Sequence, residues 1–138
     1  MIKRSTSAGG VIFNDDRQIL LVKQPENNWT FPKGHVNDDE DALTAAKREI
    51  FEEGGTEILH LVRFLGSYER PMLNPDGTED PFQIKSLVMF LFHAGSHVPK
   101  PHDSDILEAK WFSEDQVAET LTHPKDREFF LFIKKEIP

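Results

Sequence analysis

The chain contains no cysteine among its 138 residues. Disulfides, thiolate metal sites and thiol nucleophiles are therefore excluded, and with them zinc ribbons and cysteine-dependent hydrolases. No stretch approaches the roughly 20 apolar residues of a membrane-spanning helix. The N-terminal sequence MIKRSTSAGG also lacks the apolar run of a secretion signal. These absences favour a cytoplasmic protein with no membrane partner.

Positive charge is also scarce, because 16 lysines and arginines stand against 24 aspartates and glutamates, for a net charge of −8. Broad nucleic-acid binding requires a surplus of basic residues to neutralise backbone phosphates, so it is not expected. An anionic ligand would need a metal ion or a local basic patch. The length and composition suit a single globular domain spanning residues 1–138, with monomer and homodimer both left open.

Apolar runs predict a sheet with helices inserted early and late. Residues 6–13 and 18–23 predict a hairpin. The glycine pair Gly9-Gly10 suggests a bulge or a close backbone approach, with a phosphate loop as the alternative. Residues 56–69 and 84–94 predict further strands, joined by a long polar loop over 70–83.

The last third of the chain predicts a short strand over residues 106–112 and then two helices. Ser113 and Gln116 form a capping box for a helix that runs through about residue 121, and Pro124 suits the first turn of the final helix. The chain as a whole therefore predicts an α/β fold with a mixed sheet between helices.

An early helix, predicted over residues 37–53, has Asn37 or Asp38 as its N-cap. At 3.6 residues per turn, Glu49 and Glu53 lie one above the other with Glu52 beside them. Like charges at this spacing repel, and Arg48, which can pair with Glu52, is a single cation. A bound divalent metal would balance the rest, whereas the simpler alternative is a solvated acidic face.

The surrounding residues favour the metal site. From Gly34 onward the spacing reads G-x(5)-E-x(7)-R-E-U-x-E-E-x-G, where U is aliphatic. The positions are filled by Gly34, Glu40, Arg48, Glu49, Ile50, Glu52, Glu53 and Gly55. Average residue usage gives odds of about 10⁻⁶ for such a match arising by chance over the chain. This pattern resembles the Nudix box, apart from Thr56, where the family has an aliphatic residue that packs after the turn.

The resemblance to Nudix hydrolases implies an α/β/α sandwich in which the box forms a loop-helix-loop. It also implies hydrolysis of a phosphoanhydride bond in a small nucleoside-diphosphate-linked substrate, with Mg²⁺ as cofactor and Mn²⁺ as a possible substitute. Glu52, Glu53 and the Gly34 carbonyl are the implied metal ligands. Glu49 is implied as a ligand of a second metal or as the general base. Arg48 would orient the carboxylates, while Glu40, paired with Arg48, and Gly55 are structural.

Substrate contacts are less specific in the sequence. Lys33, immediately before the box, could reach a distal phosphate as a point charge, or could equally be a solvated loop lysine. Arg4, Arg70 and Lys85 are further phosphate candidates, although surface solvation is the simpler interpretation of these three cations. Tyr68 or Phe82 could stack on a base, although core packing is the simpler reading of Phe82.

The phrase WTFPKGHV, at residues 29–36, most resembles diadenosine polyphosphate hydrolases. Alternatives are nucleoside triphosphate sanitisers of the MutT type, and hydrolases of diphosphoinositol polyphosphates or nucleotide sugars. A non-catalytic binding module with the same fold is a further alternative, but such modules commonly lose the box carboxylates.

Overall fold

The computed structural model describes all 138 residues. In chain order its elements are β1 Lys3–Phe13, β2 Ile19–Gln24, η1 Pro25–Asn27, β3 Asn28–Thr30, β4 Lys33–His35, α1 Ala42–Gly54, β5 His60–Leu73, β6 Glu79–His93, β7 Glu108–Phe112, α2 Glu114–Thr120, α3 Pro124–Ile133 and η2 Lys134–Glu136. None of the helices combines the length and the hydrophobicity that crossing a lipid bilayer requires.

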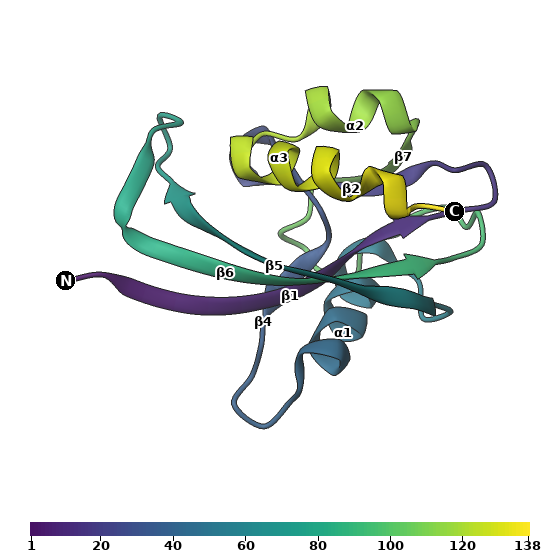
Figure 1. Ribbon diagram of the computed structural model, residues 1–138, viewed down its shortest axis with the longest axis horizontal. Helices are drawn as coiled ribbons and strands as arrows, with labels where there is room; N and C mark the ends of the chain where they lie inside the picture. The colour runs from purple at the N-terminus through teal and green to yellow at the C-terminus, as the bar shows by residue number, and fades with distance from the viewer.

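The seven strands form one mixed sheet. Its main path runs β3-β2-β1-β6-β5, with β4 paired to β1 and β7 paired to β2. The β1–β6 pairing is parallel, and the other pairings are antiparallel. Helix α1 covers one face of the sheet, and α2 and α3 cover the other (Figure 1). The predicted α/β/α sandwich around a mixed sheet is therefore confirmed.

Two hydrophobic cores lie on opposite faces of the central strands. Successive side chains on a strand point to opposite faces, so Val11 packs in the core under α2 and α3 while Ile12 packs in the core under α1. Leu91 and Phe92 of β6 divide between the cores in the same way. The continuous apolar runs of β1, β2 and β6 follow from this burial on both faces.

The early helix starts later than predicted. It begins at Ala42, because the Asp41 side chain accepts a hydrogen bond from the Thr44 N–H and caps the first turn. Asn37 and Glu40 do interact, since the Asn37 N–H donates to the Glu40 carboxylate at 3.0 Å, but they do so in a turn before the helix. The predicted N-cap at Asn37 or Asp38 is therefore wrong.

The long loop predicted over residues 70–83 is also wrong. Strand β5 continues to Leu73 and β6 begins at Glu79, which leaves a tight turn in which the Asn74 N–H donates to the Thr78 carbonyl at 2.8 Å. Pro71 is tolerated because β5 is the edge strand. As a result, Arg70 lies on a strand, directly opposite Lys85 of β6.

Several local predictions are confirmed. The first two strands form the expected antiparallel pair, and a side chain at Gly9 would collide with Pro32 and Lys33, which explains the close-packed glycine. The Gln116 side chain accepts from the Ser113 N–H at 3.4 Å, as a capping box requires, and Pro124 starts α3.

Candidate active site

The box glutamates lie where α1 meets β4. Ala45, Ala46 and Ile50 pack on the sheet, and the small alanines let the helix backbone approach closely. Two of the neighbouring glutamates are consequently buried: Glu49 is 9% exposed and Glu53 is 5% exposed. The Glu53 carboxylate accepts a hydrogen bond from the Lys33 main-chain N–H at 3.1 Å, which connects α1 to β4.

Gly34 leaves room for one of these carboxylates. A methyl group at this position would overlap the Glu49 carboxyl carbon and both of its oxygens. The absence of a side chain is therefore required for Glu49 to lie against β4. Residues 34 and 49 of the box are a steric pair, and this explains why glycine stands at the start of the pattern.

Arg48 connects the preceding turn to the helix. Its guanidinium donates to Glu40 at 2.5 and 3.1 Å, to Glu49 at 2.7 Å and, more weakly, to Glu52 at 3.4 Å. It also donates to the His35 carbonyl at 3.0 Å. The ion pair between Glu40 and Arg48 is present in the structure, and Arg48 contacts two of the three clustered glutamates.

Burial and mutual repulsion alter how these acids titrate. Burial raises the pKa of Glu53 to about 7, and the nearby Glu49 carboxylate adds to the rise. Burial also raises the pKa of Glu49, although the hydrogen bond from Arg48 opposes the shift. Both carboxylates therefore hold a proton more readily than an exposed glutamate does.

The donor set fits Mg²⁺. Arg48 donates hydrogen bonds to Oε1 of Glu49 and Oε1 of Glu52, and the Lys33 N–H donates to Oε1 of Glu53. No protein donor contacts the Oε2 atom of any of the three glutamates. No three acidic or histidine side chains converge closely enough to enclose an ion by themselves. An open set of hard oxygen donors suits Mg²⁺, which keeps several waters and shares its coordination with substrate phosphates.

A second cluster, here called the anion pocket, consists of the side chains of Lys33, Arg70 and Lys85 around a cavity of about 100 Å³. Arg70 and Lys85 face each other across the β5–β6 pair, an unfavourable arrangement for like charges. Neither lysine has an ion-pair partner within 4 Å, and only Arg70 has one, Asp126 at 3.1 Å. An excess of positive charge therefore surrounds this cavity.

Lys33 links the anion pocket to the glutamates. Its main-chain N–H contacts Glu53, while its side chain, only 4% exposed, lines the cavity. Burial, together with the charges of Arg70 and Lys85, lowers the pKa of Lys33 to about 8. The alternative of a solvated loop lysine is wrong, because Lys33 lies buried on β4.

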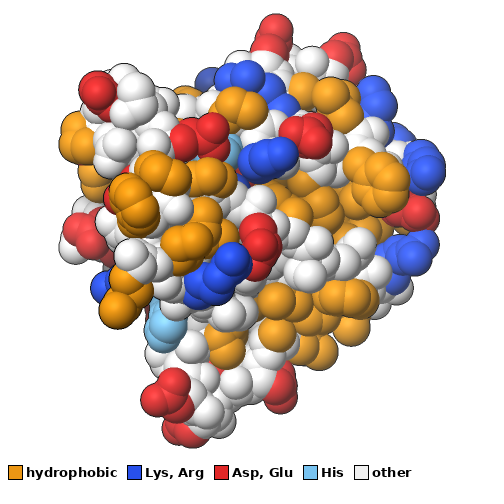
Figure 2. All heavy atoms as spheres, turned by 60° about the vertical axis from the view of Figure 1, so that its left-hand side comes forward, with side chains coloured by type: hydrophobic (Ala, Val, Ile, Leu, Met, Phe, Trp, Pro, Cys, Tyr) orange, Lys and Arg blue, Asp and Glu red, His pale blue; other side chains and the backbone are white.

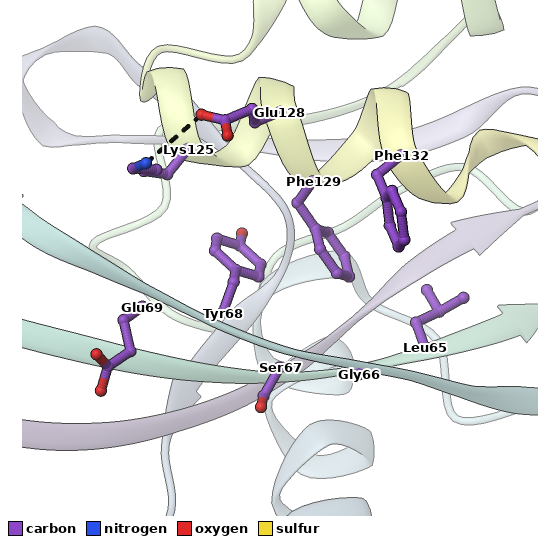
Figure 3. Close-up of a pocket in the computed structure, with 9 residues that line it drawn as sticks. All are labelled: Leu65, Gly66, Ser67, Tyr68, Glu69, Lys125, Glu128, Phe129 and Phe132. Atoms are coloured by element: carbon purple, nitrogen blue, oxygen red, sulfur yellow. Dashed lines mark ion pairs between the residues drawn. The ribbon is translucent and has the colours of Figure 1, made fainter.

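Beside the anion pocket, a groove of about 660 Å³ separates β5 from α3. Leu65 and Tyr68 point from β5 toward the helix, and Phe129 and Phe132 point back from α3 (Figure 3). The Tyr68 and Phe129 rings are stacked at 4.5 Å, and Phe132 is 70% exposed. Figure 2 shows hydrophobic side chains gathered in a hollow, with charged side chains at its margins.

A family model described as the NUDIX domain matches residues 3–132 of this chain. The chain belongs to the Nudix family. An RNA pyrophosphohydrolase from Histophilus somni (strain 2336) is 39% identical over 71 residues, which are 47% of this chain and 37% of that protein. Nudix hydrolase 16, mitochondrial, from Arabidopsis thaliana is 26% identical over 108 residues, covering 78% of this chain and 59% of the relative. The chain thus spans less than two thirds of the length of these curated relatives.

Among solved structures, a C. elegans Ap4A hydrolase binary complex superimposes on this Nudix chain with a TM-score of 0.78. The match has 21% sequence identity and covers 96% of this chain and 97% of the other. A MutT protein from Methanosarcina mazei Go1 gives a TM-score of 0.71 at 23% identity, covering 98% and 96% of the two chains. These similarities establish the Nudix fold.

Two of the predicted contact residues lie outside both cavities. Arg4 is exposed and pairs with Glu69 at 2.7 Å. Phe82, near the tip of the β5–β6 hairpin, is 60% exposed, so the expectation that it packs in the core is wrong. The remaining candidates all line one cavity or the other: Lys33, Tyr68, Arg70 and Lys85. Arg70 and Lys85 are partly buried there, so the alternative of surface solvation is wrong for these two.

Three residues at or beside the two cavities were not predicted from the sequence: Asp126, His123 and Phe129. Asp126 and His123 are almost fully buried, and both lie at the N-terminal end of α3. The available signal was the placement of an aspartate and a histidine beside a run of phenylalanines, since polar residues on an apolar face are buried only with partners. Those partners, on β5, are more than 50 residues away in sequence.

Proposed function

We propose that this chain, as a single domain spanning residues 1–138, is a Mg²⁺-dependent pyrophosphohydrolase that acts on a dinucleoside polyphosphate. One observation carries the proposal: the glutamate cluster on α1 and the anion pocket share Lys33, so opposite charges adjoin along one site. A metal ion and a chain of phosphates are the ligands that this pair of clusters can satisfy together.

On the glutamate side, Glu52, Glu53 and the Gly34 carbonyl would hold Mg²⁺. When bound, Mg²⁺ supplies positive charge that stabilises the negative charge developing on the phosphoanhydride oxygens. Glu49 is the proposed base that takes a proton from the attacking water, because burial raises its pKa and so favours proton uptake. Arg48 holds Glu49 and Glu52 in place and does not touch the substrate.

On the other side, Lys33, Arg70 and Lys85 would bind the phosphates remote from the cleaved bond. The groove beside them offers apolar surface and the Tyr68–Phe129 stack, which suit the face of a nucleobase. The groove and the anion pocket adjoin, because Tyr68 and Arg70 lie two residues apart on one strand. One substrate could therefore place its nucleoside in the groove and its phosphates in the anion pocket.

The aromatic groove favours a dinucleoside polyphosphate over a diphosphoinositol polyphosphate, whose ring carries phosphates in place of an apolar face. The fold similarity to the C. elegans Ap4A hydrolase is consistent with this choice. Nucleoside triphosphates and nucleotide sugars fit the same two subsites less fully, because they offer fewer phosphates to three cations.

A second candidate, a 5′-triphosphorylated RNA end, is favoured by the 39% identity to an RNA pyrophosphohydrolase across the segment that was matched. Like a dinucleoside polyphosphate, this RNA end carries a nucleoside whose phosphates are linked by phosphoanhydride bonds. Against it stands the net charge of −8, which disfavours contacts to the remaining RNA backbone.

A substrate panel tests the proposal. Phosphate or nucleotide release is measured with diadenosine tetraphosphate, ATP, 8-oxo-dGTP, ADP-ribose, a diphosphoinositol polyphosphate and a 5′-triphosphorylated RNA, with Mg²⁺ and with EDTA. The expected result is the highest kcat/KM for diadenosine tetraphosphate and no turnover with EDTA. Preference for another substrate would overturn the assigned class, and no turnover of any would overturn the enzymatic function.

A further inference from the structure

Asp126 is the one carboxylate in contact with the anion pocket cations. Its side chain is fully buried and accepts a hydrogen bond from the Tyr68 hydroxyl at 2.6 Å and one from Arg70 Nη1 at 3.1 Å. A buried charge persists only where it is paired and hydrogen-bonded. Tyr68 lines the groove and Arg70 lines the anion pocket, so one carboxylate contacts both subsites.

We infer that Asp126 is a positioning residue, which holds Arg70 in the anion pocket in the orientation that binds substrate phosphate. The inference rests on the proposed function and extends it to a residue outside the Nudix box. Its ligand class is the phosphate chain of a nucleoside polyphosphate, represented in isolation by inorganic tripolyphosphate.

Two sets of hydrogen bonds hold Asp126 in place, one within α3 and one from His123 to β5. Its own N–H donates to the His123 carbonyl at 3.1 Å in the first turn of α3. His123 Nδ1 accepts from the Lys125 N–H at 3.0 Å, so the ring proton is on Nε2, which donates to the Pro71 carbonyl at 2.9 Å. This bond secures the start of α3 to the residue that follows Arg70.

The pairing also determines which Arg70 donors face the ligand. Arg70 uses only Nη1 within the protein, which leaves Nε and Nη2 free to donate to a phosphate. Without the Asp126 charge, the guanidinium would lose its ion-pair partner and would still face the ammonium groups of Lys33 and Lys85, whose repulsion would turn it out of the cavity. Asp126 therefore acts through Arg70 and does not touch the phosphate.

The test measures tripolyphosphate binding by calorimetry in wild type, Asp126→Asn, Arg70→Gln and the double variant. Asp126→Asn keeps the shape and the acceptor for Tyr68, and it is expected to weaken binding by at least about tenfold. In the Arg70→Gln background, the same change is expected to add less than twofold, because its target is gone. Unchanged binding in Asp126→Asn, or full additivity in the double variant, would overturn the inference.

A matched control is Glu136→Gln, which removes the carboxylate of the Arg63–Glu136 pair at 2.6 Å, an ion pair outside both cavities. Tripolyphosphate binding is expected to stay within twofold. If Asp126→Asn does not fold, Asp126→Glu replaces it in the same cycle, since it keeps the charge and moves the carboxylate by one methylene. At least a threefold loss of affinity is then expected, and wild-type affinity would overturn the inference.

Steady-state kinetics separate positioning from structural damage. Asp126→Asn is expected to raise KM for diadenosine tetraphosphate by about tenfold and to keep kcat within about twofold. A loss confined to kcat would indicate a smaller folded fraction and would overturn the positioning role. Tripolyphosphate binding needs no turnover, so a chain that binds it without hydrolysing any substrate would refute the proposed function and leave the Asp126 inference standing.

Discussion

The glutamate cluster and the anion pocket meet at Lys33, yet they are built in opposite ways. The glutamates lie within five consecutive residues of one helix, so helical geometry alone brings them together. The cations come from three strands at positions 33, 70 and 85, and only the sheet register unites them. A one-residue slip of β5 would turn Arg70 to the opposite face and destroy the anion pocket, but it would leave the glutamates adjacent.

The two clusters also differ in the sign of their unbalanced charge. Of the three glutamates, Glu49 and Glu52 pair with one arginine and Glu53 pairs with none. Of the three cations, Arg70 pairs with one aspartate, and the two lysines have no ion-pair partner. Each cluster is therefore left with an excess of its own sign. Variants of the glutamate side should alter turnover, whereas variants of the cationic side should alter substrate affinity.

Glu53→Gln is expected to have the largest effect. Neutralising this buried carboxylate removes a proposed Mg²⁺ ligand while preserving its shape, so kcat should fall by about 10³-fold. Thermal unfolding should show no loss of stability, because burial already disfavours the charged form. The exposed Glu119→Gln on α2 is the control, and activity that survives in Glu53→Gln would remove this residue from the site.

Gly34→Ala is expected to have the second largest effect. It tests whether activity needs the space that Gly34 leaves for the Glu49 carboxylate, without changing any charged group. The added methyl group would displace the Glu49 carboxylate from β4, so kcat should fall by about 10²-fold and stability by about 1–3 kcal/mol. Gly95→Ala is a matched control, since a side chain there meets nothing within 4 Å. Kinetics and chemical denaturation of both variants supply the comparison, and equal behaviour would contradict the steric pairing.

Lys33→Met tests the cationic side. Removing a buried cation that has no ion-pair partner should raise KM about tenfold, with kcat changed by less than about threefold. The melting temperature should stay level or rise, because the ammonium group is desolvated in the folded chain. Lys47→Met, on the exposed side of α1, is the control. A fall in kcat without a change in KM would assign Lys33 to the chemical step.

The smallest expected effect is a pH dependence of stability that comes from Glu53. Burial raises its pKa to about 7 from an ordinary value of 4.5. Between these values the folded chain holds a proton that the unfolded chain has released. The stabilising contribution is therefore complete below pH 4.5 and is lost as the pH rises through 7.

Urea unfolding in EDTA at pH 5 and pH 8 measures this contribution. The free energy of unfolding of wild type should fall relative to Glu53→Gln by on the order of 2 kcal/mol between the two pH values. Parallel profiles for the two proteins would show that Glu53 titrates normally in the folded chain.

The sequence alone determined the helix that carries Glu49, Glu52 and Glu53, the glycines at both ends of the box, and the alternation of strands with helices. These features depend on contacts between residues close in the chain, whose geometry is nearly fixed by φ and ψ. The onset of the helix at Ala42 was missed because Asp38 and Asp41 are both suitable caps, and only the contact with Thr44 distinguishes them.

Only the tertiary structure decided the partners of Arg70. Its segment, rich in proline, aspartate and glycine, predicts a loop, and edge pairing with β6 overrode that preference. The position of Asp126 beside a run of phenylalanines indicated only that it needs a partner, and its contacts with Tyr68 and Arg70 arise when α3 docks on β5. Contacts across more than 50 residues depend on register and docking, which local preferences in the sequence do not specify.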